Sequence, residues 1–152
     1  MLKIVAGGLD DPRVIRLLGI HLASSRAQTA PGSAHALDLA GLKSPEICFW
    51  SAWDKDDLLA VAAMKRLSHS QGEVKSMHTA EVVRRRGVGS AMLKHIIDVA
   101  RNRGIKKLSL ETGSWPFFQP AVALYKRHGF VECPPFGDYK LDPNSIFMTR
   151  EV

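Results

Sequence analysis

The sequence predicts an α/β protein in which helices flank one mixed, mostly antiparallel sheet of about six to seven strands. Apolar and aromatic runs at residues 47–53 and 58–67 flank the polar turn at residues 54–57, which is a hairpin signal, and residues 73–79 read as the next strand. From residue 88 to residue 100 the apolar side chains instead recur every three or four positions, which indicates an amphipathic helix. This change of period predicts strands followed by alternating helices and strands.

The other elements have local signals of their own. Residues 2–6 read as a short strand, and the Asp11-Pro12 pair supplies a cap and a first-turn proline for a helix that ends near residue 26. Gly104 and Gly129 follow the basic ends of helices predicted from residue 88 and over residues 120–128. Strands are expected at residues 107–111, 130–133 and 145–150. Residues 29–45 are the least regular stretch, with a helical turn or two expected between residues 34 and 42.

Length and composition favour a single domain that spans residues 1–152. The chain is 45% hydrophobic, and its longest apolar run, near residues 58–64, has only seven residues, too few to cross a bilayer. The N-terminus shows neither a basic leader with a long apolar segment nor a cleavage site, so we expect a cytoplasmic protein. The histidines lack metal-ligand spacing, and no metal is expected.

The chain is basic, with a formal net charge of +6 and a pI near 9.6. Such a charge attracts polyanions in general. The net charge alone does not distinguish nucleic acid, an anionic membrane and a phosphorylated cofactor as the binding partner.

The segment of residues 79–90 joins a predicted strand to the amphipathic helix. A helix start offers free N–H groups and the positive end of the helix dipole, and Gly87 and Gly89 let a phosphate approach the backbone. The three arginines at residues 84–86 add positive charge, and Ser90 adds a hydroxyl. The segment has neither the Gly-Lys-Ser/Thr ending of a P-loop nor the third glycine of a dinucleotide fingerprint. It therefore predicts a diphosphate site of another kind.

Two motifs carry a resemblance to a known family. Residues 84–89, Arg-Arg-Arg-Gly-Val-Gly, match the Q/R-x-x-G-x-G/A signature of the GNAT acyltransferases, and residues 121–130 look like that superfamily's A-x-x-L-Y-x-x-x-G-F segment. The resemblance covers the whole chain in element order and is specific from residue 73 to residue 130. Residues 137–148 also resemble a bacterial group of small acetyltransferases, some of them associated with indole-3-acetic acid metabolism.

The resemblance implies an acetyl-CoA-dependent N-acetyltransferase that moves an acetyl group from the CoA thioester to a primary amine by direct attack in a ternary complex. The implied pose places the pyrophosphate on the amides of residues 85–90 and pantetheine along the strand edge at residues 77–83. The residues implied to bind the cofactor are Met77, His78, Thr79, Val82, Val83, Arg84, Arg85, Arg86, Gly87, Val88, Gly89 and Ser90.

Acetyl transfer to an ammonium of pKa about 10 requires a base or a water relay. Glu73 lies where one branch of the family places its base, and we expect its side chain on the same strand face as those of Lys75 and Met77. Glu111, near the end of the following strand, is the alternative base. The non-catalytic interpretation is an exposed strand carboxylate paired with Lys75 for Glu73 and a solvent-facing strand end for Glu111. Tyr125 matches the tyrosine to which the family assigns protonation of the leaving thiolate.

The acceptor is predicted to be a small-molecule amine or a peptide N-terminus. Glu111, Trp115 and Phe118 are the predicted acceptor contacts, with core packing as the alternative for the aromatic pair. Phe118 also stands where many relatives carry an asparagine, so the usual side-chain hydrogen bond to the cofactor is not expected.

Two other functions are consistent with the sequence: a catalytically degenerate acyl-CoA sensor and a basic nucleic-acid-binding module. The second lacks a recognised nucleic-acid-binding motif. We expect neither a nucleic-acid nor a membrane partner, and a homodimer is implied by the resemblance alone.

Overall fold

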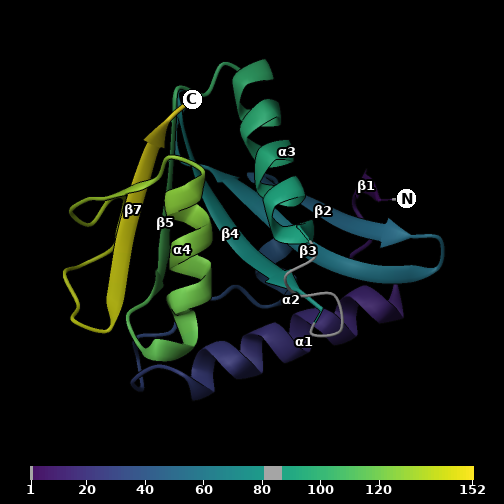
Figure 1. The fold of residues 1–152 in the computed structure, drawn as a ribbon, viewed down its shortest axis with the longest axis horizontal. Coiled ribbons are helices and arrows are strands. Elements are labelled where there is room, and N and C mark those ends of the chain that lie inside the picture. The colour runs from purple at the N-terminus through teal and green to yellow at the C-terminus, as the bar shows by residue number, and fades with distance from the viewer. Residues whose placement is uncertain (1, 81–86) are drawn as a thin grey trace.

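A computed structural model describes residues 2–80 and 87–152 (Figure 1). Within these residues, seven strands form one sheet in the order β1-β2-β3-β4-β5-β7-β6. The strands are β1 (Lys3–Ala6), β2 (Ile47–Asp54), β3 (Asp57–Arg66), β4 (Gln71–Thr79), β5 (Lys107–Gly113), β6 (Val131–Glu132) and β7 (Ser145–Glu151). The helices are α1 (Pro12–Ala27), α2 (Leu39–Leu42), α3 (Val88–Asn102), the 3-10 helix η2 (Pro116–Phe118) and α4 (Gln119–Arg127).

The strand pairings confirm the predicted mixed, mostly antiparallel sheet. The first four strands form an antiparallel meander, and β7 pairs antiparallel with both β5 and β6. The parallel pair is β4 with β5, which α3 connects. A crossover of this kind is required because parallel neighbours cannot be joined by a tight turn.

Helices cover both faces of the sheet. One core cluster joins apolar residues of α3, including Met92 and Ile96, to strand residues such as Met64 and Leu108. The other joins α1 and α2 to β2 and β3, and Val14 at its centre is fully buried. Figure 1 shows α3 and α4 on the viewer's side of the sheet and α1 along its lower edge.

The helix ends follow the sequence signals. The Asp11 carboxylate accepts a hydrogen bond from the Arg13 amide at 2.8 Å, which caps α1 just before Pro12. Gly104 follows the end of α3 and Gly129 follows the end of α4, with φ values of 76° and 86°. Both lie in the left-handed conformation, which glycine adopts at low cost.

The sheet opens between its two parallel strands. Within the described residues, positions 71–73 of β4 pair with positions 107–109 of β5, and the later parts of the two strands are not paired with each other. At the same level, β4 carries a register irregularity against β3, and Ser76 has a φ of 52°, which costs a non-glycine residue about 1–3 kcal/mol. The bulge bends β4 beyond the point where its pairing with β5 ends.

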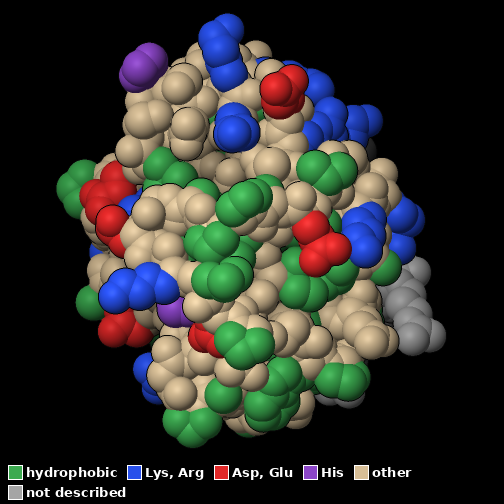
Figure 2. Space-filling model, turned by 90° about the vertical axis from the view of Figure 1, so that its left-hand side faces the viewer, with side chains coloured by type: hydrophobic (Ala, Val, Ile, Leu, Met, Phe, Trp, Pro, Cys, Tyr) green, Lys and Arg blue, Asp and Glu red, His purple; other side chains and the backbone are tan. Residues whose placement is uncertain are grey.

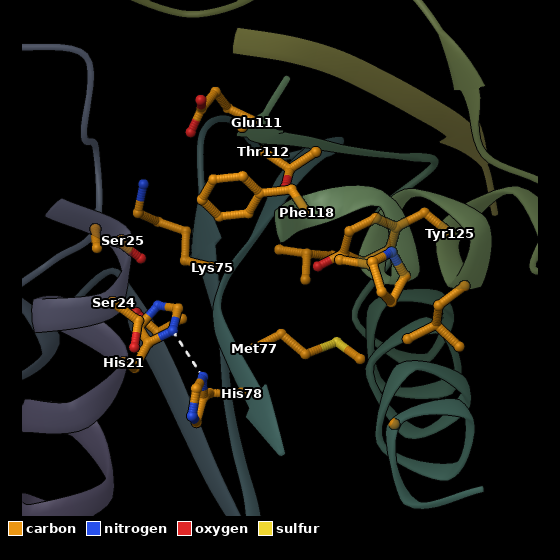
Figure 3. Close-up of a pocket in the computed structure, with 18 of the residues that line it drawn as sticks. His21, Ser24, Ser25, Lys75, Met77, His78, Glu111, Thr112, Phe118 and Tyr125 are labelled. Atoms are coloured by element: carbon orange, nitrogen blue, oxygen red, sulfur yellow. Dashed lines mark hydrogen bonds between the residues drawn. The ribbon is translucent and has the colours of Figure 1, made fainter. Parts of the chain in front are cut away.

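The bulge corrects one prediction about β4. Strict alternation would put Glu73, Lys75 and Met77 on one face, but Met77 packs against the core cluster that includes α3, whereas His78 contacts His21 of α1. The extra residue at Ser76 reverses the alternation, so Lys75 and His78 share the face that Met77 was expected to occupy (Figure 3).

The outer surface carries several large hydrophobic side chains near β7 and β6. Leu141 is 86% exposed and Val131 is 62% exposed. Figure 2 looks onto this side of the molecule and shows hydrophobic side chains across the middle of the face, with basic side chains toward its top and right. None of the described helices combines the length and apolar character needed to span a membrane.

Candidate active site

A cavity of about 470 Å³ occupies the opening between β4 and β5. Its walls come from α1, β4, β5, the start of α3, η2, α4 and the loop at residues 33–36 (Figure 3). The cavity brings together most of the described residues predicted to form the site. These are Glu73, Met77, His78, Thr79, Gly87, Gly89, Ser90, Glu111, Phe118 and Tyr125.

The first turn of α3 lies at one end of the cavity. Gly87 precedes the helix with a φ of 80°, and a Cβ on Gly89 would lie 3.2 Å from Leu124 Cδ2 of α4. The Ser90 hydroxyl is 3.0 Å from His128 Nε2, which ties this turn to the end of α4. The glycines therefore permit both the backbone turn and the close approach of the two helices.

Some predicted cofactor residues are not on this surface. Val88 is buried in the core that α3 shares with the sheet. The remaining predicted residues of this turn, Val82, Val83, Arg84, Arg85 and Arg86, lie outside the described part of the chain.

A network of three side chains, the buried Glu73 and the half-buried Lys75 and Tyr139, forms the base of the cavity near the parallel strand pairing. Glu73 Oε2 accepts hydrogen bonds from Lys75 Nζ at 3.1 Å and from the Tyr139 hydroxyl at 2.5 Å. Lys75 Nζ is also 3.0 Å from the Tyr139 oxygen, so the three groups close a triangle. Burial, and then the neighbouring Glu73 carboxylate, raise the pKa of Tyr139, which stays protonated and holds Glu73 in place.

A second carboxylate, Glu111 on β5, faces the same space. Burial raises its pKa, while the charges of His35 and Lys75 act in the opposite direction. In Figure 3 its carboxylate and the Lys75 amino group point toward one another from neighbouring strands. A carboxyl group with a raised pKa suits proton transfer near neutral pH.

Tyr125 reaches the cavity from α4. Its side chain is buried, and its ring contacts Phe130 with centroids 5.9 Å apart. Burial and the charge of Glu111 raise the pKa of Tyr125 to about 12, so the hydroxyl is a proton donor at any pH near neutrality.

A histidine pair on the α1 side was not predicted as part of the site. His21 Nδ1 of α1 and His78 Nδ1 of β4 are 3.2 Å apart, so one ring donates to the other. Burial and the neighbouring His78 lower the pKa of His21 to about 4. The signal in the sequence was a histidine continuing the buried face of α1 after Leu17 and Leu18.

The aromatic cluster after β5 divides between the cavity and the surface. Phe118 lines the cavity and lies so close to Gly113 that a Cβ on that glycine would be 2.2 Å from its ring. Trp115 does not belong to the cavity lining. It is 38% exposed, and its indole N–H donates to Asn144 at 3.0 Å.

Two loops distant in sequence meet over the Glu73 end of the cavity. The Ser33 hydroxyl donates a hydrogen bond to the Asp142 carboxylate at 2.6 Å. The rings of His35 and Tyr139 pack edge-to-face with their centroids 5.0 Å apart. Hydrogen bonds from Ser33 and from the Asn144 backbone lower the pKa of Asp142, which keeps this contact charge-assisted.

A mixed, mostly antiparallel sheet flanked by helices, with glycines at the start of α3, is the architecture expected from the sequence. The chain belongs to the acetyltransferase (GNAT) family, whose model matches residues 19–130.

Individual relatives agree with this assignment. The chain is 48% identical over 144 residues to YsnE, an uncharacterized N-acetyltransferase of Bacillus subtilis, with 95% of each chain covered. It is 36% identical over 121 residues to the IAA acetyltransferase of Azospirillum brasilense, which covers 79% of this chain and 78% of the relative. A crystal structure of a GNAT family acetyltransferase from Elizabethkingia anophelis, with acetyl-CoA bound, has the same fold. It is 19% identical, with a TM-score of 0.72 over 99% of this chain and 98% of its own.

Proposed function

We propose that this protein is an acetyl-CoA-dependent N-acetyltransferase that transfers the acetyl group to a primary amine by direct attack in a ternary complex. The observation that carries the proposal is one cavity that joins the start of α3 to Tyr125 and to the carboxylates of Glu73 and Glu111. Membership of the family and the acetyl-CoA in the Elizabethkingia structure support the choice of cosubstrate.

The described residues fit the two ends of such a cosubstrate. Gly87, Gly89 and Ser90 would receive the pyrophosphate at the start of α3, where helix amides and the dipole favour an anion. The edge of β4 at residues 74–77, where the pairing with β5 has ended, would receive the amide groups of pantetheine as a neighbouring strand would. Bound there, the thioester supplies the electrophilic carbonyl of the reaction.

The contacts favour Glu111 over Glu73 as the base. Glu73 Oε2 already accepts two hydrogen bonds, from Lys75 and Tyr139, so this oxygen is engaged within the protein rather than open to a bound amine. Glu111 is the carboxylate whose pKa burial raises, and it therefore accepts a proton from an ammonium more readily. In this mechanism Glu111 removes the proton of the amine, and Glu73 is a positioning residue that holds Lys75 and Tyr139.

Tyr125 is the proposed acid for the leaving thiolate. Its raised pKa keeps the proton on the phenol, so the hydroxyl is available to donate to the sulfur as the C–S bond breaks. A thiol, with a pKa of about 8.5, is more acidic than this phenol, so net transfer of the proton to the thiolate requires reprotonation of the tyrosinate, and donation requires the sulfur to lie within hydrogen-bond reach of the hydroxyl.

Calorimetric titration with acetyl-CoA tests the cofactor site. Gly89→Glu places bulk against Leu124 and a negative charge at the proposed phosphate turn, so we expect binding to be lost. Gly19→Glu adds the same charge at an exposed helical position with open space around it and should bind as the native chain does. Native binding that survives in Gly89→Glu would contradict the site.

Release of CoA in the presence of an amine panel tests the reaction. Turnover that requires both acetyl-CoA and a primary amine, with acetylated amine as the product, supports the proposal. Tight binding of acetyl-CoA with no turnover over the whole panel would instead identify an acyl-CoA sensor.

A further inference from the structure

Lys75 has an unused hydrogen-bond donor in a buried position. An ammonium group has three N–H donors, and within the described structure Lys75 Nζ has two acceptors, Glu73 Oε2 and the Tyr139 oxygen. The Lys75 side chain is only 9% exposed and lines the cavity, so a ligand in the cavity can reach this third donor. A hydrogen bond to a charged donor is worth more than one between neutral groups, so a ligand that supplies an acceptor here gains affinity.

The third donor and the proposed base border the same part of the cavity. Lys75 and Glu111 both line it, and Figure 3 shows their charged ends directed toward one another. They are not among the ion pairs of the described residues, although their charges interact. A bound molecule can therefore place a hydrogen-bond acceptor at Lys75 and an amine at Glu111 at the same time.

The charges around Lys75 decide what kind of hydrogen-bond-accepting atom fits beside it. The ammonium of Lys75 is already compensated by Glu73, and ionised Glu111 leaves the three residues with one net negative charge. A cationic amine brings the cluster to neutrality. A zwitterion would add a carboxylate near Glu73 and Glu111, and like charges in a buried site repel one another. An uncharged oxygen satisfies Lys75 without this repulsion.

We propose that the acetyl acceptor is a primary amine with an uncharged hydrogen-bond-accepting oxygen on the carbon next to the amine-bearing carbon, as in an α-amino amide. The amine lies at Glu111 and the carbonyl oxygen at Lys75. A free α-amino acid is a poor acceptor, because its carboxylate meets two carboxylates of the protein. This inference rests on the proposed acetyl transfer and assigns Lys75 as the residue that selects the acceptor.

The test compares acceptors that share one side chain. Phenylalaninamide, phenylalanine and phenethylamine differ only in the group beside the amine, and Phe118 offers an apolar wall for their common ring. We expect the kcat/KM for acetylation of phenylalaninamide to exceed that of phenylalanine at least 10-fold. A dipeptide amide as a fourth acceptor separates a peptide N-terminus, if it is turned over, from a small amino amide, if it is not.

Substitution of Lys75 isolates its contribution from differences in amine basicity. In Lys75→Met, the ratio of kcat/KM for phenylalaninamide to that for phenethylamine should fall about 10-fold or more, the loss expected for one charge-assisted hydrogen bond. Because both rates are measured on the same variant, general damage to the site cancels in the ratio. Lys126→Met removes an exposed lysine of α4 and should leave the ratio unchanged.

Two results would overturn the inference without touching the proposed function. One is acetylation of phenylalanine at least as fast as that of its amide by the native protein, a comparison that needs no variant to fold. The other is an unchanged ratio in a folded Lys75→Met. By contrast, absence of acetyl transfer to every amine tested would refute the proposed function itself.

Discussion

The contact between Gly113 and Phe118 yields a quantitative prediction. A Cβ built on Gly113 would lie 2.2 Å from two carbons of the Phe118 ring, whereas carbon atoms in contact lie about 3.5–4.0 Å apart. Gly113→Ala therefore overlaps the ring by more than an ångström, and either the ring or the end of β5 must move. Neither can move freely, because Phe118 also packs edge-to-face on Phe117 with centroids 5.1 Å apart.

Overpacking of this kind costs about 1–3 kcal/mol of unfolding free energy, which corresponds to roughly 2–12 °C in the melting temperature of a chain of this length. The backbone of Gly113 does not itself require glycine, since its φ is not in the left-handed region. Removing the ring should therefore remove the penalty. In a Phe118→Ala background we expect Gly113→Ala to cost less than about 0.5 kcal/mol.

Urea unfolding of the native chain, both single variants and the double variant measures this coupling. Gly19→Ala is the matched control, because Gly19 lies on the exposed face of α1 and a Cβ added there would have no neighbour within 4 Å. Alanine at this position should stabilise the helix by about 0.5–1 kcal/mol. Equal destabilisation by Gly113→Ala with and without the Phe118 ring would refute the steric explanation.

Three further predictions concern the titratable groups of the site. Tyr125→Phe should lower kcat about 100-fold or more while leaving acetyl-CoA affinity unchanged, as judged by steady-state kinetics and calorimetry; an unaltered kcat would remove the tyrosine from the reaction. The kcat/KM of the native enzyme should rise with pH through a pKa above the usual range of a carboxyl group, since Glu111 acts as a base only when ionised, and Glu111→Gln should abolish that limb of the pH profile. The neutral His21 ring should make the fold less stable as the pH falls from about 6.5 to about 4, by up to roughly 3 kcal/mol, because the unfolded chain takes up a proton that the folded chain excludes. Urea midpoints at pH 7 and pH 5 measure this, and a His21→Gln variant with the same pH dependence as the native chain would contradict it.

The local signals of the sequence were sufficient for nearly every element of the fold. Asp11 and Pro12 fix the start of α1, and the apolar period from Val88 onward fixes α3, because caps and amphipathic faces are properties of neighbouring residues. The short η2 helix before α4 was not predicted, since its Pro-Phe-Phe sequence has no periodic pattern.

The candidate site was predicted less completely. Tyr125 and the two carboxylates belong to recognisable motifs or strand positions, and the fold brings all three to one cavity. Tyr139 gave no local signal of its role, and for His21 the sequence indicated only a place on the buried face of α1. Each acquires its role from a partner more than fifty residues away, Glu73 and His78 respectively. Trp115 showed the opposite case, an aromatic residue that the tertiary structure turns toward Asn144 and the surface.

By itself, the sequence determined the order of strands and helices, the glycine turn before α3 and the family, because these depend on periodicity and on residues close together in the chain. Only the tertiary structure decided which side chains share the site. The bulge at Ser76 reverses the face of β4, so that Lys75 and His78 lie on the α1 side while Met77 joins the core. The tertiary structure also decided the environments of Glu73 and Glu111. The hydrogen bonding of Glu73 and the burial of Glu111 both depend on packing between segments that are distant in the sequence.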